Sequence, residues 1–150
     1  MIAIDTNALI VLLIGLIDPQ RIKTHKRTSI YDEQDFFDLV SIIESFDKLL
    51  VLPNVWTELD NILNRFKGDE KYQYIIKTSE MMKASSEKFI ESLKGIESPN
   101  YFDLGLTDAL LLELAKECDF LITSDSSLSD YAMANNIQVY DLVKNRNERL

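Results

Sequence analysis

Four acidic residues stand at positions where this sequence could do chemistry: Asp5, Glu58, Asp108 and Asp125. If they were gathered without a basic neighbour they could not all stay ionised, because mutual repulsion raises carboxyl pKa values unless a divalent cation neutralises the group. A single histidine and a single cysteine exclude an intramolecular disulfide, a cysteine zinc cluster and any two-histidine site. The available oxygen ligands select Mg²⁺ or Mn²⁺ over zinc. Either ion can activate a water and hold a phosphate oxygen, so the implied reaction is phosphodiester hydrolysis.

The elements that must position these acids alternate between short apolar strands and helices. Short, mainly apolar segments predict buried strands at residues 1–4, 49–52, 119–123 and 137–140. Helical spacing predicts helices at residues 8–17, 32–48, 54–66 and 106–117. A largely helical stretch is predicted at 70–93, a loop at 95–105, and a turn with a short helix at 124–136. This alternation predicts one α/β domain over residues 1–150, in which helices cover both faces of a central parallel sheet.

Two of the acids directly follow predicted strands, and the other two lie on predicted helices. Ligand sites of open parallel sheets form beyond the carboxyl ends of the strands, where Asp5 and Asp125 are expected. Ordinary structural roles stay open: Asp125 can cap a helix, Glu58 can be a solvated flank residue, and Asp108 can stabilise a helix N-terminus by roughly 0.3–1 kcal/mol. The joint placement of the four at corresponding ends of the elements favours a site.

Small polar residues stand beside two of these acids in the sequence. Thr6 and Asn7 follow Asp5, and Thr123 and Ser124 precede Asp125. Such side chains can orient water or the metal-binding carboxylates, although turn formation explains them nearly as well.

Four short motifs resemble those of PIN-domain nucleases. The segment IDTN (residues 4–7) is similar to the family's first motif, in which an Asp that ends a strand is followed by Thr and Asn. The second, third and fourth motifs are resembled by PNVWTEL (53–59), LGLTDAL (104–110) and LITSD (121–125). These matches follow the family's order and span residues 2–125.

The resemblance implies a three-layer α/β/α fold with a central parallel sheet of four or five strands, in the order 3-2-1-4 with a short fifth strand optional. It also implies a Mg²⁺ or Mn²⁺ site built by Asp5, Glu58, Asp108 and Asp125, and an endoribonuclease acting on single-stranded or structured RNA. Many small stand-alone members of the family are toxins of the virulence-associated protein C type. The resemblance therefore also predicts an antitoxin partner and a homodimer.

The densest basic run of the chain offers candidate substrate-binding residues: Arg21, Lys23, Lys26 and Arg27. With Tyr31 nearby for base stacking, this run could follow the phosphates of a nucleic acid strand. A solvated loop that balances neighbouring acids is the commoner role of such a run, and it stays open. Phe66 is expected in the core.

Charge and hydropathy limit the partners and the location of the protein. A net charge of −9 gives no general attraction to nucleic acid, so RNA binding would depend on cations and local basic patches. The apolar run at residues 8–17 is too short to span a bilayer and lacks the basic residues that precede a signal-peptide core, so it predicts a buried helix of a cytoplasmic protein.

Two classes of function remain. The first is a Mg²⁺- or Mn²⁺-dependent endoribonuclease, and the alternative is a non-catalytic PIN-like module that binds RNA or a protein partner. A phosphoacceptor receiver domain fits poorly, because such a domain needs an acidic pair near its first strand and Asp5 has no acidic neighbour.

Overall fold

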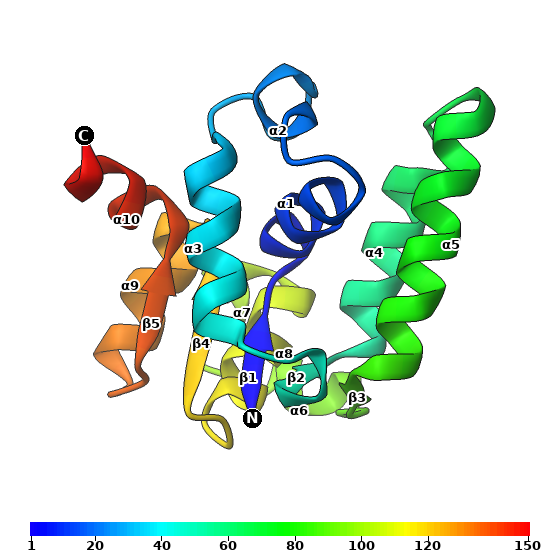
Figure 1. Cartoon of the computed structure of the whole chain (residues 1–150). Helices are drawn as coiled ribbons and strands as arrows, with labels where there is room; N and C mark the ends of the chain where they lie inside the picture. The colour runs from blue at the N-terminus through cyan, green and yellow to red at the C-terminus, as the bar shows by residue number, and fades with distance from the viewer.

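The computed structural model describes residues 1–150 and contains a single sheet of five parallel strands (Figure 1). The strands are β1 (Ile2–Ile4), β2 (Leu49–Val51), β3 (Ser86–Glu87), β4 (Phe120–Thr123) and β5 (Val139–Asp141). Their order in the sheet is β3-β2-β1-β4-β5, with Ile4 opposite Ile122 and Thr123 opposite Asp141. The predicted α/β fold with a central parallel sheet is confirmed, and the order agrees with the one that the resemblance implies.

Two groups of helices cover the sheet. One group packs around α1 (Thr6–Ile17) and comprises α3 (Glu33–Ile43), α4 (Pro53–Leu63) and α5 (Gly68–Ala84); the other comprises α6 (Ser92–Ile96), α8 (Leu106–Ala115) and α9 (Ser126–Ala134). Right-handed crossovers between parallel strands place the two groups on opposite faces. The remaining elements are α2 (Arg21–Thr24), the 3₁₀ turn η1 (Phe46–Lys48), α7 (Tyr101–Leu104) and α10 (Leu142–Arg149).

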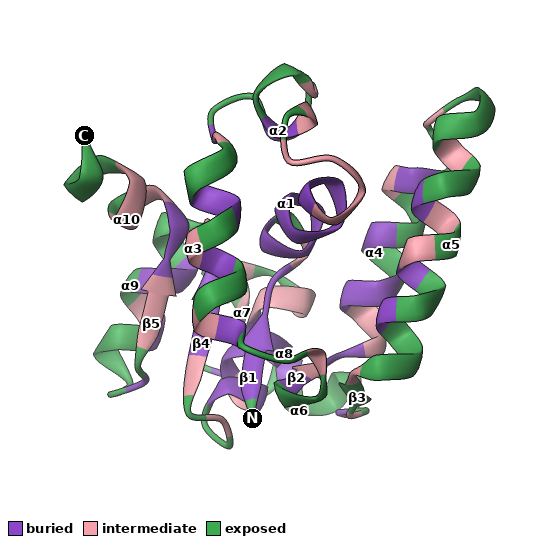
Figure 2. Cartoon of the chain, in the orientation of Figure 1, coloured by how far each residue is buried: buried purple, intermediate pink, exposed green.

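Helix α1 lies at the centre of the fold. Its residues from Ala8 to Gly15 are all buried, and Figure 2 shows this helix and strand β1 in the colour of buried residues. The prediction of a buried helix at this apolar run is confirmed. At Gly15 the ring of Phe36 comes so close that an added Cβ would lie 2.1 Å from its Cδ1 atom, so glycine permits the close packing of α1 against α3. No helix of the chain is both long enough and apolar enough to cross a membrane.

Several boundaries differ from those that the sequence predicts. Strand β3 lies within the stretch predicted as largely helical, and both of its residues are exposed, so no apolar pattern marks it. The predicted helix over residues 32–48 ends at Ile43, because Glu44 adopts a left-handed backbone conformation with φ of 65°. The segment predicted as a loop at 95–105 includes the end of α6 and all of α7, and α10 follows β5 where no helix was predicted.

Candidate acidic active site

Asp5 ends strand β1 and caps helix α1, and it is 5% exposed. Its Oδ1 accepts a hydrogen bond from the Ala8 N–H (2.8 Å), and its Oδ2 accepts from the Thr123 hydroxyl (2.5 Å) and the Ser124 N–H (3.0 Å). Burial raises the pKa of Asp5, these three hydrogen bonds oppose the rise, and the charge of Asp125 adds to it. The carboxylate is therefore held rigidly while its negative charge is incompletely compensated.

Thr123 connects Asp5 to Asp125. Its hydroxyl donates to Asp5 and accepts a hydrogen bond from the Asp125 N–H (3.0 Å). Asp125 Oδ1 accepts from the Leu128 N–H (2.9 Å) and so caps α9, which leaves Asp125 Oδ2 without a hydrogen-bond partner in the chain. Of the four polar residues singled out beside the acids, Thr123 and Ser124 bond to Asp5. Thr6 and Asn7 form the first turn of α1 and make no hydrogen bond to the acids.

The pKa of Asp108 is affected by the charges of the other three acids. Asp108 stands in the first turn of α8 and is half-buried. Burial, and then the charges of Asp125, Asp5 and Glu58, raise the pKa of Asp108 from 3.8 to about 7. No hydrogen bond and no basic side chain contributes to this pKa. We call Asp5, Glu58, Asp108 and Asp125 the acidic cluster, because the charges of the other three all act on Asp108.

Local sequence explains how two helices deliver their acids to this place. Pro53 begins α4 directly after β2, which sets Glu58 in the second turn of a helix that starts at the carboxyl end of its strand. Gly105, with φ of 81°, joins α7 to α8 in a conformation that other residues rarely adopt. Because the chain bends sharply at Gly105, α8 begins at Leu106, and Asp108 therefore lies in the first turn of this helix.

The acidic cluster fits a hard divalent cation by the chemistry of its donors. Asp108 has no hydrogen-bond partner, Asp125 keeps Oδ2 free, and the three bonds to Asp5 leave one of its roughly four acceptor sites unused. No three acidic, histidine or cysteine side chains converge as a ready-made metal cage. Glu58 is exposed and its side chain makes no hydrogen bond, so it can rotate inward around an ion, whereas the cap to Leu128 holds the exposed Asp125 in place.

Two further residues lie at the same edge of the sheet and were not predicted there. Asp141 ends β5 opposite Thr123, and its Oδ1 caps α10 by accepting from the Lys144 N–H (3.0 Å). Asp141 could have been predicted by the argument used for Asp5, because it also lies at the carboxyl end of a strand. Tyr31 is 5% exposed and close enough to Ser124 and Asp5 for both to affect its pKa, which burial raises. Burial excludes the predicted use of Tyr31 as a surface platform for bases, and nothing in its sequence context indicated this.

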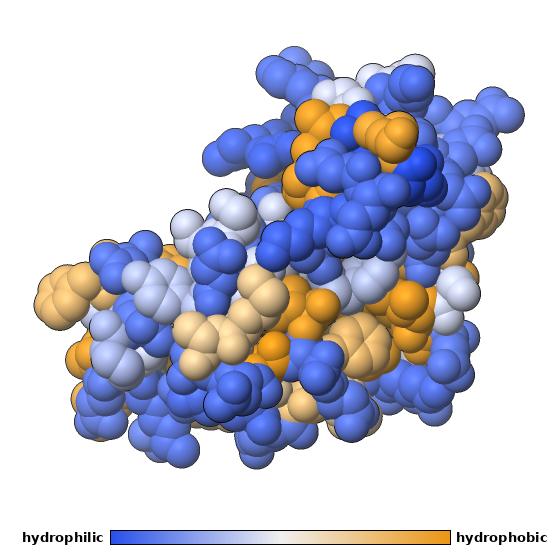
Figure 3. Space-filling view, turned by 90° about the vertical axis from the view of Figure 1, so that its left-hand side faces the viewer, coloured by the Kyte–Doolittle hydropathy of each residue, from blue (hydrophilic) through white to orange (hydrophobic).

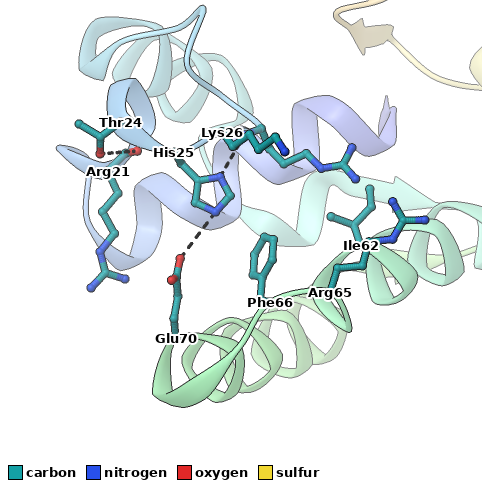
Figure 4. Close-up of a pocket in the computed structure, with 9 residues that line it drawn as sticks. Arg21, Thr24, His25, Lys26, Ile62, Arg65, Phe66 and Glu70 are labelled. Carbon is teal, nitrogen blue, oxygen red and sulfur yellow. Dashed lines mark hydrogen bonds and ion pairs between the residues drawn. The ribbon is translucent and has the colours of Figure 1, made fainter.

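The predicted substrate-binding residues fall into two places. Arg21, Lys26 and Arg27 line a cleft of about 830 Å³ together with Arg65 (Figure 4). Lys23 lies outside this cleft and lines a separate hollow near the start of α3. Arg65 was not predicted because it lies far along the chain from the basic run. Phe66, which was expected in the core, is half-buried and also lines the cleft.

No protein-family model matches the sequence, and no match is found among the curated proteins. The resemblance to PIN-domain nucleases therefore depends on the four motifs and on the order of the strands.

Proposed function

We propose that this chain is a Mg²⁺- or Mn²⁺-dependent endoribonuclease that hydrolyses phosphodiester bonds of RNA. One observation carries the proposal: Asp108 is close enough to Asp5, Glu58 and Asp125 for their charges to raise its pKa, and no basic side chain opposes this rise. A structural role would be better served by a neighbouring Lys or Arg, since unpaired buried charge is costly. A divalent cation relieves the repulsion and would bind where the substrate is expected, at the carboxyl ends of the strands.

The members of the acidic cluster have different tasks in this proposal. Asp5 and Asp108 are the main ligands, Asp5 because three hydrogen bonds fix its orientation and Asp108 because nothing else occupies its oxygens. Glu58 and Asp125 contact the ion directly or through water and orient the attacking water. The bound ion supplies activation of a water and stabilisation of charge on a phosphate oxygen. By bonding to both, the Thr123 hydroxyl fixes the position of Asp5 relative to the start of α9.

The test replaces Asp108 by Asn, which keeps the shape of the side chain and removes its charge. Cleavage of a fluorescent single-stranded RNA is measured in Mg²⁺, in Mn²⁺ and in excess chelator. We expect Asp108→Asn to slow cleavage on the order of a hundredfold or more, because metal affinity depends strongly on each ligand. Asp130→Asn is the matched control, since Asp130 is exposed on α9 and lies outside the acidic cluster. Undiminished cleavage by the wild type in chelator would refute the metal mechanism.

Asp5 is a less suitable target for this test. In Asp5→Asn the new amide group would present a donor to the Ser124 N–H or to the Ala8 N–H, both of which now donate to the carboxylate. Loss of activity in that variant would mix altered folding with altered chemistry. Asp108 makes no such bonds, so its replacement isolates the charge.

A non-catalytic PIN-like module is the second candidate. It is favoured by the caps that Asp5 and Asp125 supply to α1 and α9, since these explain both residues without a metal. Calorimetric titration with Mn²⁺ beside the cleavage assay separates the two, because binding without turnover supports the module.

The antitoxin partner and the homodimer stay predictions from the resemblance. The side of the molecule that carries α9, α10 and β5 shows mostly hydrophilic side chains with separate hydrophobic patches (Figure 3). This face therefore does not single out a surface for either partner.

A further inference from the structure

The cleft introduced above separates the segment 21–27 from the turn between α4 and α5. Four cationic side chains line it: Arg21, Lys26, Arg27 and Arg65. The single acid in its lining, Glu70, lies 3.6 Å from the imidazole of His25. Figure 4 marks this contact with a dashed line. In a chain with a net charge of −9 this is a local concentration of positive charge, and we call it the basic cleft.

Aromatic rings form one wall of the basic cleft. The rings of Phe66 and His25 lie 5.0 Å apart, and both contact Tyr74 beneath them, with ring centroids 5.2 Å and 6.2 Å away. Cationic side chains beside an aromatic surface are the combination that binds single-stranded nucleic acid, since the cations follow phosphates and the ring stacks on a base.

Tyr74 forms the buried floor beneath these two rings. Its hydroxyl lies near Arg21 and Glu70, which both line the basic cleft and act on its pKa. The aromatic wall and the charged side chains of the cleft are therefore parts of one continuous surface.

The basic cleft and the acidic cluster lie along one side of α4. Glu58 and Ile62 are one helical turn apart, and Arg65 follows in the turn that ends the helix. At about 1.5 Å per residue, the four residues from Glu58 to Ile62 rise about 6 Å, so the cleft begins within a few nucleotides of an extended strand from Glu58. A strand with one phosphate at the acids would therefore extend into the cleft.

We propose that the basic cleft holds the strand of a single-stranded RNA a few nucleotides away from the bond to be cut, with phosphates against Arg27 and Arg65 and a base against Phe66. This inference rests on the proposed function for its choice of RNA. The cleft adds what the acids cannot supply, because a cluster of carboxylates repels a polyanion until a cation is bound. The affinity for substrate then comes from the cleft and the chemistry from the cluster.

The experiment measures binding without cleavage. A short fluorescent single-stranded RNA is titrated in excess chelator, with anisotropy as the readout, against the wild type, Arg65→Ala and Lys23→Ala. The last two remove one positive charge each from exposed positions, but Lys23 lies outside the cleft. We expect Arg65→Ala to weaken binding roughly five- to tenfold and to lower the salt dependence by about one phosphate contact. At about 0.15 M salt, Lys23→Ala should change binding less than about twofold, because its charge lines a separate hollow and salt weakens its effect on the cleft.

His25 provides a reporter inside the cleft, because it is the single histidine of the chain. Its imidazole NMR signals should shift on addition of the RNA in chelator, while inorganic phosphate at the same phosphate concentration shifts them much less. Equal weakening by Arg65→Ala and Lys23→Ala, or binding of a polyglutamate peptide in place of RNA, would overturn the proposal. The two proposals fail separately: loss of RNA binding in Arg65→Ala with unimpaired cleavage by Asp108→Asn refutes the acidic active site alone, and the reverse pattern refutes the basic cleft alone.

Discussion

Asp108 should make the stability of the folded protein fall as the pH rises. Its pKa is raised from 3.8 to about 7 by burial and by Asp125, Asp5 and Glu58. Between those two values the unfolded chain has lost this proton and the folded chain retains it, so each increase in pH favours unfolding. The full rise corresponds to about 4 kcal/mol, a ceiling that water and counterions around a half-buried group reduce.

The replacement Asp108→Asn removes this dependence because an amide does not titrate. At about pH 2.5 this residue is almost fully protonated in both states of the wild type, and the variant should be as stable as the wild type. At pH 8 the variant should be more stable by about 2–4 kcal/mol. Chemical denaturation in urea across this pH range, with chelator present, measures the difference.

Divalent cations should reverse the order of stability. An ion that binds only the folded state stabilises it by about 2.7 kcal/mol at a concentration one hundred times its dissociation constant. Mn²⁺ at pH 8 should therefore stabilise the wild type and leave Asp108→Asn nearly unchanged, with Asp130→Asn as the control. A stability difference between the wild type and Asp108→Asn that stays constant from pH 4 to pH 8 would refute the reasoning, since it could not arise from ionisation.

Three other changes test the packing and the caps. Gly15→Ala places a methyl group against the ring of Phe36 and should cost about 1–3 kcal/mol in urea unfolding; Phe36→Leu should recover part of that loss in a double-mutant cycle, and strict additivity would contradict the contact. Asp5→Ala should cost about 1–3 kcal/mol at pH 5, since it removes a helix cap and leaves two donors unpaired; an unchanged melting temperature would argue against that network. Arg149→Ala leaves the buried Asp35 carboxylate without its cation, which now lies 2.8 Å away, and should cost about 1–3 kcal/mol. Faster amide exchange in α10 is the expected sign of that change, and unaltered exchange there would show that the ion pair does not hold the helix.

The sequence predicted the elements whose burial leaves a pattern. Strands β1, β2 and β4 are short apolar segments within a polar chain, and all three were found close to their predicted bounds. Strand β3 has two polar, exposed residues at the edge of the sheet and pairs only through its backbone with β2, so hydropathy could not reveal it. The short helices α6 and α7 are similarly too brief for a periodic pattern.

The candidate site shows the same division. Asp5 and Asp125 could be placed from the sequence because a strand end fixes where the next residue points. Arg65 could not be added to the basic run, because the contact between segment 21–27 and the end of α4 depends on how α1, α2 and α5 pack together. Long-range packing of this kind leaves no signal in local spacing.

The bond between Asp5 and Thr123 joins residues that are 118 positions apart, and β1 pairs directly with β4. While the chain is being synthesised, β1 can pair with β2 early, but its second neighbour, β4, exists only after most of the polypeptide has been made. A ribosome-bound fragment that ends before β4 lacks both Asp125 and the hydroxyl that orients Asp5. Any hydrolytic activity would therefore be absent from incomplete chains, including nascent chains on a ribosome that is still translating their mRNA.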